Sequence, residues 1–201
     1  ANYYRTPPEI DEVNPGEYGL DFIIKSGRAL IWPAYKGSMN RISDMNISFP
    51  RTQDHMRSFR QLLSNWTVDT SRTIDFLESR EEFNSENIYY LGMSYGGIYT
   101  THVLLFEKRF KAAVLYVGGT STSIPPMSDG KNHFPRITLP VLMLNGRQDY
   151  LVPETAPKAM IASIGTPEED KNLIFYDSGH WPLPRNQMIK ETLFWLDKYQ
   201  D

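Results

Sequence analysis

The chain has 201 residues, of which 40% are hydrophobic and 22% are charged, and 21 basic against 24 acidic residues give a formal net charge of −3. This composition is typical of a globular protein and excludes disordered and collagen-like chains, while the length suits a single domain over residues 1–201. Without a basic excess we expect neither nucleic acid nor an anionic membrane as a partner. No apolar run reaches the roughly 20 residues that a membrane span needs.

The sequence contains no cysteine, which excludes disulfides, thiolate metal sites and a cysteine nucleophile. The lack of cysteine leaves the compartment open, with the cytoplasm favoured. The first residue is Ala1 and no signal peptide follows it. This start is therefore a processed end, an artificial boundary or a break in a longer chain.

Apolar runs rich in β-branched and aromatic residues alternate along the chain with amphipathic helical patterns. In chain order, the patterns predict a helix at residues 18–26, a strand at 29–34, a helix at 68–79, a strand at 88–91, a helix at 97–110, a strand at 112–117, a strand at 141–144, a helix at 160–164, a strand at 173–176 and a helix at 187–199. This alternation predicts an α/β fold with a mostly parallel sheet and helices on both faces. The long irregular stretch 118–134 is either a short cap over a site or a plain solvated connection.

A G-x-S-x-G motif lies between the predicted strand 88–91 and the helix after it, with Ser94 at its centre. In this context the motif places a serine hydroxyl on a strained turn above the sheet. We expect side chains at Gly92 and Gly96 to collide with the neighbouring strand and helix, which explains the two glycines. The backbone N–H of Tyr95 would point toward the same spot and could stabilise an oxyanion. The alternative is a glycine-rich turn with an idle serine.

A serine hydroxyl needs a base, and His180 is the best placed of the four histidines. It follows the strand 173–176, at the edge of the sheet where α/β folds build their sites. Asp149 follows the strand 141–144 and is predicted to orient His180. Asp177 is the rival acid, but it lies only three residues before His180, and the chain order serine, acid, histidine favours Asp149.

Taken together, these residues resemble the α/β-hydrolase superfamily, and most closely its prolyl-oligopeptidase and dienelactone-hydrolase branches. The likeness rests on residues 92–97, on 140–149 with its Asn-Gly-x-x-Asp pattern, and on Ser178, Gly179 and His180. The segments 26–37 and 184–199 are similar to hydrolase domains fused to bacterial serine/threonine kinases. The resemblance implies an α/β-hydrolase fold and a Ser-His-Asp mechanism, but no particular substrate.

The chain departs from this family in two places. In the family, a strand ending in a glycine motif precedes the helix 18–26 and supplies a second oxyanion donor, yet residues 1–8 read as the loop after such a strand. We therefore expect the N-terminal strands to lie upstream and a companion N-terminal fragment to complete the fold; a naturally minimal domain is the alternative. Residues 38–40 also lack the tyrosine that related peptidases use as a donor. Tyr35 is the nearest substitute, or a packing residue.

The favoured function is that of a carboxylesterase acting on small-molecule esters through an acyl-enzyme, without a metal or a cofactor. Met39, Tyr150 and Trp181 flank the expected site and are candidates for an apolar acyl pocket, although such aromatics also serve simply in packing. The alternatives are a serine peptidase or a thioesterase with the same machinery, or a non-catalytic regulatory or binding module.

Overall fold

The computed structural model describes residues 14–41, 53–99, 101–120 and 130–200. Residues 1–8, which were interpreted as the loop after a missing strand, lie outside the described residues. So does most of the stretch 118–134. The chain divides into two compact units, Ala1–Phe83 and Asn84–Asp201, and each is described here by itself. The expectation of a single domain over the whole chain stays a prediction.

The described residues of the second unit form one sheet of four parallel strands. Its strands, which lie side by side in chain order, are β1 (Ile88–Met93), β2 (Phe110–Tyr116), β3 (Val141–Gly146) and β4 (Lys171–Tyr176). Every residue of β3 is buried, as is every residue of β2 except Lys111. Such continuous apolar runs arise because helices cover both faces of a parallel sheet.

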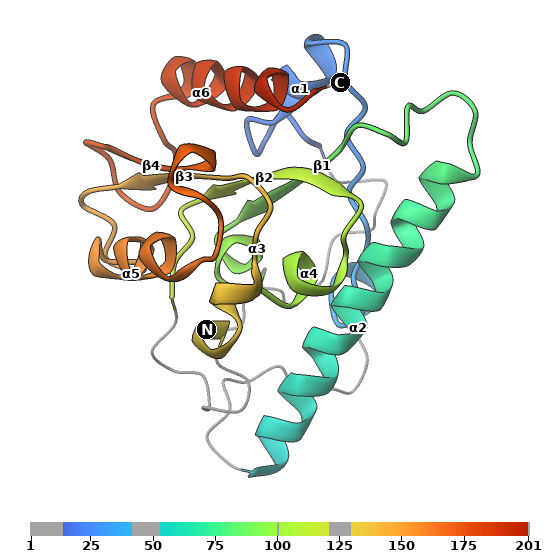
Figure 1. Ribbon diagram of the computed structural model, residues 1–201, viewed down its shortest axis with the longest axis horizontal. Coiled ribbons are helices and arrows are strands. Elements are labelled where there is room, and N and C mark those ends of the chain that lie inside the picture. The colour runs from blue at the N-terminus through green and yellow to red at the C-terminus, as the bar shows by residue number, and fades with distance from the viewer. Residues whose placement is uncertain (1–13, 42–52, 100, 121–129, 201) are drawn as a thin grey trace. The chain divides into compact units, whose positions relative to one another are not determined.

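Helices flank this sheet on both sides, as predicted (Figure 1). The helix α6 (Arg185–Lys198) packs against β2 and β3 on one face, while α3 (Tyr95–Ile98), α4 (Thr101–Phe106) and α5 (Thr155–Ser163) lie on the other. The described part of this unit also contains the short 3-10 turns η4 (Gly130–Asn132), η5 (Phe134–Arg136) and η6 (Glu168–Asp170). The α/β prediction is therefore confirmed.

One helical prediction in this unit is wrong in its extent. Residues 97–110 do not form a single helix, because α3 ends at Ile98 and α4 ends at Phe106. The buried Glu107 carboxylate accepts hydrogen bonds from both the backbone N–H and the guanidinium of Arg109. These bonds turn the chain, so that Phe110 is the first residue of β2 and not the last of a helix.

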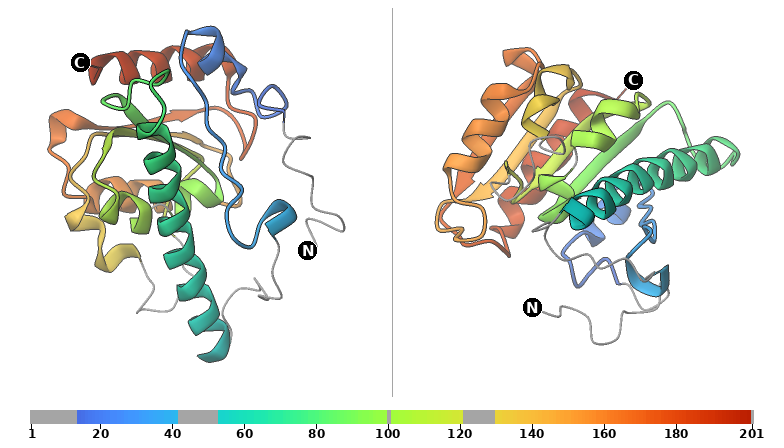
Figure 2. Two further views of the ribbon diagram at one scale, coloured as in Figure 1. Left: turned by 90° about the vertical axis from the view of Figure 1, so that its right-hand side faces the viewer. Right: turned by 90° about the horizontal axis from the view of Figure 1, so that it is seen from below.

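The first unit holds α1 (Asp21–Lys25), the 3-10 turn η2 (Met39–Arg41) and the long helix α2 (Gln53–Glu78), which Figure 2 shows as one unbroken helix. The sequence pattern predicted only the end of α2, at residues 68–79. Its earlier part buries Phe59, Leu62 and Leu63, whose three- and four-residue spacing is the signal that was missed.

The predicted strand at residues 29–34 is wrong. This segment has no regular secondary structure, and no strand among the described residues pairs with it. A strand needs a neighbour for its backbone groups, and Pro33 has no N–H to offer one. The carbonyl of Ala34 instead accepts a hydrogen bond of 2.6 Å from the side chain of Arg41.

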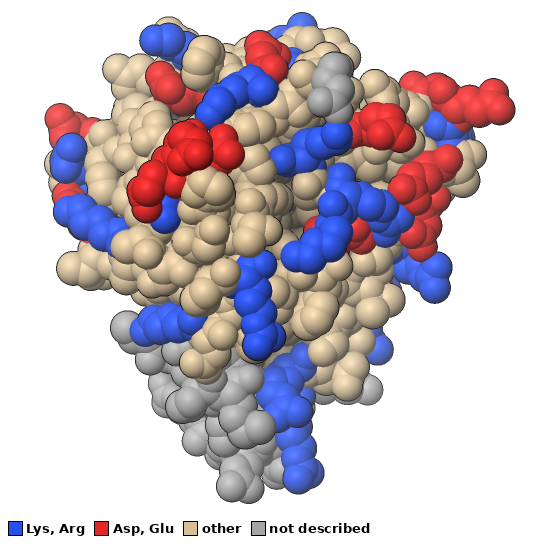
Figure 3. Space-filling model, viewed as in Figure 1, with Lys and Arg blue, Asp and Glu red and all other residues tan. Residues whose placement is uncertain are grey.

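Of the helices that the structure describes, none combines the length and the apolar character needed to cross a bilayer. On the face drawn in Figure 3, basic side chains lie among acidic ones, and neither sign forms a continuous field.

Candidate active site

Ser94 occupies the sharp turn between β1 and α3. Its φ of 48° and ψ of −105° are strained for a residue with a side chain. The backbone holds this conformation from both sides, because the Ser94 N–H donates to the Tyr116 carbonyl at 2.9 Å and the Ser94 carbonyl accepts from Ile98 N–H at 2.8 Å. Ser94 is therefore fixed at the carboxyl end of the sheet.

Close contacts explain two of the glycines around Ser94, and one of these two was predicted. A Cβ at Gly92 would lie 2.7 Å from the Gly96 carbonyl oxygen, so the prediction for Gly92 is confirmed. A Cβ at Gly96 would meet only the Tyr90 hydroxyl, at 3.4 Å, so the predicted collision there is wrong. The second crowded position is Gly97, where a Cβ would lie 2.8 Å from the Cα of Gly118.

The structure brings the side chains of Ser94, His180 and Asp149 together. His180 Nε2 lies 2.9 Å from Ser94 Oγ, and His180 Nδ1 lies 2.7 Å from Asp149 Oδ2. The Asp149 side chain is completely buried, whereas that of His180 is 18% exposed. The three groups form a chain of hydrogen bonds that runs from the interior toward the solvent.

The Asp149 carboxylate is held by backbone groups as well as by the imidazole. Its Oδ1 accepts hydrogen bonds from the N–H groups of Leu151 and Val152, each at 2.9 Å, which leaves Oδ2 for His180. Asp177, the rival acid, instead has an 87% exposed side chain whose carboxylate lies 3.6 Å from Arg147 Nε. Of the two carboxylates, therefore, only Asp149 contacts His180.

A close backbone contact that was not predicted joins the end of β3 to the loop that carries His180. A Cβ at Gly146 would lie 2.1 Å from the Gly179 carbonyl oxygen and 2.4 Å from that of Ser178. Close by, Gln148 N–H donates to the Ser178 carbonyl at 3.0 Å. The Asn-Gly-x-x-Asp pattern was its available signal, since a glycine just before the acid suggests a close approach.

Three further candidate residues lie next to these side chains in the sequence. Tyr95 is the first residue of α3, so its backbone N–H lies at the start of the helix that follows Ser94. The Tyr150 side chain follows Asp149 and is 84% exposed. Trp181 follows His180 and packs edge-on against Tyr116, with 6.2 Å between ring centroids.

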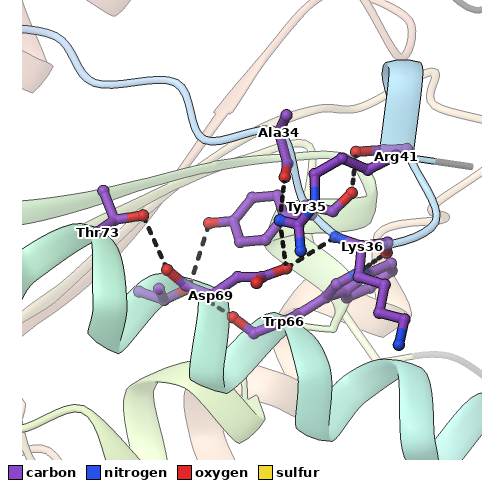
Figure 4. A network of polar contacts seen from close by, with 9 residues as sticks. Ala34, Tyr35, Lys36, Arg41, Trp66, Asp69 and Thr73 are labelled. Carbon is purple, nitrogen blue, oxygen red and sulfur yellow. Dashed lines mark hydrogen bonds and ion pairs between the residues drawn. The ribbon is translucent and has the colours of Figure 1, made fainter.

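Tyr35 and Met39 belong to the first unit, and their predicted roles at the site stay predictions. The Tyr35 hydroxyl lies 3.3 Å from Thr70 Oγ1, which donates its own proton to the Trp66 carbonyl at 2.8 Å (Figure 4). The Tyr35 hydroxyl is therefore the donor to Thr70, and burial raises the pKa of its phenol. Met39 begins the turn η2 with a φ of 50°.

The segment between these two residues is fastened to α2 through Asp69. Its Oδ2 accepts the backbone N–H of Lys36 at 2.7 Å and pairs with Arg41 Nη1 at 3.1 Å (Figure 4). Trp66 Nε1 donates to the Lys36 carbonyl at 2.9 Å. Polar contacts to one helix, and not strand pairing, hold residues 34–41 in place.

The profile of the dienelactone hydrolase family matches residues 26–183, which is most of the chain. The chain belongs to the dienelactone hydrolase family. No match was found among curated protein sequences. Membership of this family agrees with the second of the two branches named by the sequence resemblance, the dienelactone hydrolases.

Solved structures similar to this dienelactone hydrolase family member include esterases and a lipase. A cold-adapted esterase from an Arctic intertidal metagenomic library is 22% identical, with a TM-score of 0.61; the match covers 75% of this chain and 66% of that esterase. Acetyl xylan esterase 1 from Thermoanaerobacterium sp. is 17% identical over 92% of this chain and 70% of its own, with a TM-score of 0.68. The Paleococcus ferrophilus monoacylglycerol lipase is 12% identical over 97% and 92%, with a TM-score of 0.64. At these identities the likeness establishes the α/β-hydrolase fold, and this chain spans about two thirds of the Arctic esterase.

Within the part of this family member that the structure describes, no group of three or more histidine, aspartate or glutamate side chains is arranged to hold a metal ion. His180 contacts Asp149 through Nδ1 and Ser94 through Nε2. The imidazole lies within hydrogen-bond distance of the Ser94 hydroxyl, as a proton transfer between the two would require.

Proposed function

We propose that this chain is a serine hydrolase that cleaves small carboxylic esters, with Ser94 as nucleophile, His180 as general base and Asp149 as the acid that orients it. Membership of the dienelactone hydrolase family supports an ester hydrolase in general. The observation that carries the finer proposal is the unbroken hydrogen-bond chain from Ser94 Oγ through both imidazole nitrogens to Asp149 Oδ2.

The direction of these hydrogen bonds follows from the chemistry of the groups. An ionised carboxylate can only accept, so Nδ1 of His180 carries the proton and Nε2 is left to accept from the Ser94 hydroxyl. When Ser94 Oγ attacks the ester carbonyl, its proton passes to Nε2 and the buried Asp149 stabilises the imidazolium. His180 then returns the proton to the departing alcohol. Water, activated by the same base, releases the acyl group from Ser94.

The tetrahedral intermediate requires donors for its oxyanion. Tyr95 supplies its backbone N–H, because the residue after the nucleophile in a G-x-S-x-G turn starts the helix at this point. Tyr35 is the candidate for the second donor, and its hydroxyl proton would have to leave Thr70 to reach the substrate. If Tyr35 is the donor, Tyr35→Phe lowers kcat by about 10²- to 10³-fold, whereas a packing role leaves kcat unchanged.

Tyr150 and Trp181 are proposed to flank the acyl group, since each directly follows one of the three polar residues in the chain. The 84% exposure of the Tyr150 side chain leaves it accessible to a ligand. Met39 is proposed as a third lining residue. An apolar lining suits short acyl chains better than charged ones.

Labelling with a fluorophosphonate, read by intact mass, tests the nucleophile. We expect one label per chain in the wild type and none in Ser94→Ala, with hydrolysis of p-nitrophenyl acetate lost in parallel. His180→Ala is expected to abolish both signals. Full activity in Ser94→Ala would refute the assignment of Ser94 as the nucleophile. Labelling at another residue would show that this other residue is the nucleophile.

A matched panel of substrates separates the reaction classes that use the same machinery. We expect hydrolysis of acetyl and butyryl esters and little hydrolysis of a peptide amide. Faster turnover of an acyl thioester would identify a thioesterase, and faster cleavage of the amide a peptidase. Failure to label or turn over any of these substrates would favour a non-catalytic module.

A further inference from the structure

Tyr116, the last residue of β2, contacts both halves of the proposed catalytic site. Its carbonyl accepts the Ser94 N–H at 2.9 Å. Its ring packs edge-on against Trp181, with 6.2 Å between centroids and 61° between planes, and Trp181 directly follows His180. One fully buried residue therefore contacts the serine turn through its backbone and the histidine loop through its side chain.

A hydrogen bond to α6 fixes the hydroxyl of Tyr116. It lies 2.9 Å from Thr192 Oγ1 in α6, and both residues are completely buried. Neither hydroxyl can turn to water, so each depends on the other for its hydrogen bond. Since α6 begins at Arg185, shortly after His180, this bond ties β2 to the helix that follows the histidine loop.

The backbone beside Tyr116 is also tightly held. Val117 has a φ of 45°, a conformation that is rare for a β-branched residue. It is fully buried, and its N–H donates to the Leu144 carbonyl at 2.8 Å. Strained residues persist only where several contacts fix them, and they gather at functional sites. Strain at both Ser94 and Val117 therefore marks the ends of β1 and β2 as a region of fixed geometry.

We propose that Tyr116 is a positioning residue, which sets the distance between Ser94 Oγ and His180 Nε2 through its anchored ring and its carbonyl. This inference rests on the proposed function. Tyr116 takes no part in proton transfer itself, because burial raises the pKa of its phenol far above the range of enzyme assays. Its hydroxyl stays protonated and acts only through the orientation of the ring.

Two single variants remove the anchor from opposite sides. Tyr116→Phe keeps the ring and loses the hydroxyl, while Thr192→Val keeps the shape of the threonine and loses its oxygen. We expect each variant to lower kcat about tenfold and to leave KM nearly unchanged. This loss is smaller than the roughly 10²-fold loss that a misplacement of about 1 Å can cause, because only one hydrogen bond is removed. Because both remove the same bond, the double variant is expected to lose no more than either single variant.

Tyr176→Phe is the matched control. Tyr176 is a buried tyrosine at the end of β4, and its hydroxyl has no hydrogen-bond partner among the residues that the structure describes. We expect Tyr176→Phe to retain wild-type kcat. The rate of fluorophosphonate labelling, measured well below each unfolding midpoint, reports the Ser94–His180 pair independently of substrate binding. Thr192→Ser is expected to restore both the labelling rate and kcat relative to Thr192→Val.

The outcomes separate this inference from the proposed function. If Ser94→Ala is inactive while Tyr116→Phe and Thr192→Val keep full kcat and labelling rate, the positioning role is overturned and the serine mechanism stands. An equal loss in Tyr176→Phe also overturns it, because any buried tyrosine would then behave alike. If Ser94→Ala remains active, the proposed function itself fails.

Discussion

Replacing Gly146 with alanine is expected to disable the site without touching any of its three polar side chains. The added Cβ would lie 2.1 Å from the Gly179 carbonyl oxygen and 2.4 Å from that of Ser178. Both are backbone atoms, so neither can rotate away as the end of a side chain would. The loop must shift as a whole, and it carries His180 with it.

The size of the effect follows from this overlap. Restoring even a 3.0 Å contact with Gly179 requires a displacement of about 0.9 Å, the difference between 3.0 and 2.1 Å. A misplacement of about 1 Å can cost about 10²-fold in rate, or about 2.7 kcal/mol of transition-state stabilisation. We therefore expect kcat/KM for p-nitrophenyl acetate, and the rate of fluorophosphonate labelling, to fall about 10²-fold in Gly146→Ala. Overpacking is also expected to cost about 1–3 kcal/mol of folding stability.

Gly179→Ala is the matched control, because a Cβ at Gly179 has nothing within 4 Å. The same glycine-to-alanine change, made directly in the loop that carries His180, thus causes no collision. Both variants are assayed at a temperature where each is folded by circular dichroism. Equal labelling rates in the folded Gly146→Ala and Gly179→Ala proteins would refute the reasoning.

Three other outcomes follow from the same structure. Asp149→Asn is expected to lower kcat by about 10⁴-fold, whereas Asp177→Asn, whose side chain is 87% exposed, leaves kcat within about twofold; equal losses would contradict the choice of acid. Gly97→Ala is expected to lower the free energy of unfolding in urea by about 1–3 kcal/mol, and Gly96→Ala by much less, because only the former places a Cβ against backbone. Burial lowers the pKa of His102 below its ordinary 6.5, so the unfolded chain binds more protons and stability falls as the pH drops below about 6.5. His102→Gln is expected to reduce that fall in the unfolding midpoint, and an unchanged slope would argue against it.

The second unit was predicted well because its central strands β2 and β3 are buried on both faces, and every residue of β1 and β4 except Asn172 is buried or half-buried. Such strands appear as unbroken apolar runs, and the four runs at 88–91, 112–117, 141–144 and 173–176 all lie within observed strands or end one residue beyond. The carboxyl ends of parallel strands share one edge, so residues that follow different strands meet there. Ser94, Asp149 and His180 come together for this reason, although the chain separates them widely.

The first unit was predicted poorly because its order depends on partners that no local pattern reveals. The apolar run at 29–34 has the composition of a strand, but a strand exists only with a neighbour, and polar contacts to α2 hold the adjoining segment instead. The early part of α2 has many polar residues, so the apolar periodicity of its buried stripe, which includes Leu62 and Leu63, was not recognised. The Asn-Gly-x-x-Asp pattern signals a close approach at Gly146, but it does not reveal that the loop carrying His180 is what lies there.

The geometry of the candidate site is maintained largely by main-chain groups. The Tyr116 carbonyl holds Ser94, the N–H groups of Leu151 and Val152 hold Asp149, and the N–H of Gln148 holds the loop that carries His180. A backbone group is present whatever the side chain, so these restraints survive substitution at most positions. Places where backbone meets backbone demand a particular residue, which is glycine. The fold can therefore be shared with esterases that have few identical residues, while a single added methyl group at Gly146 is expected to disturb the site.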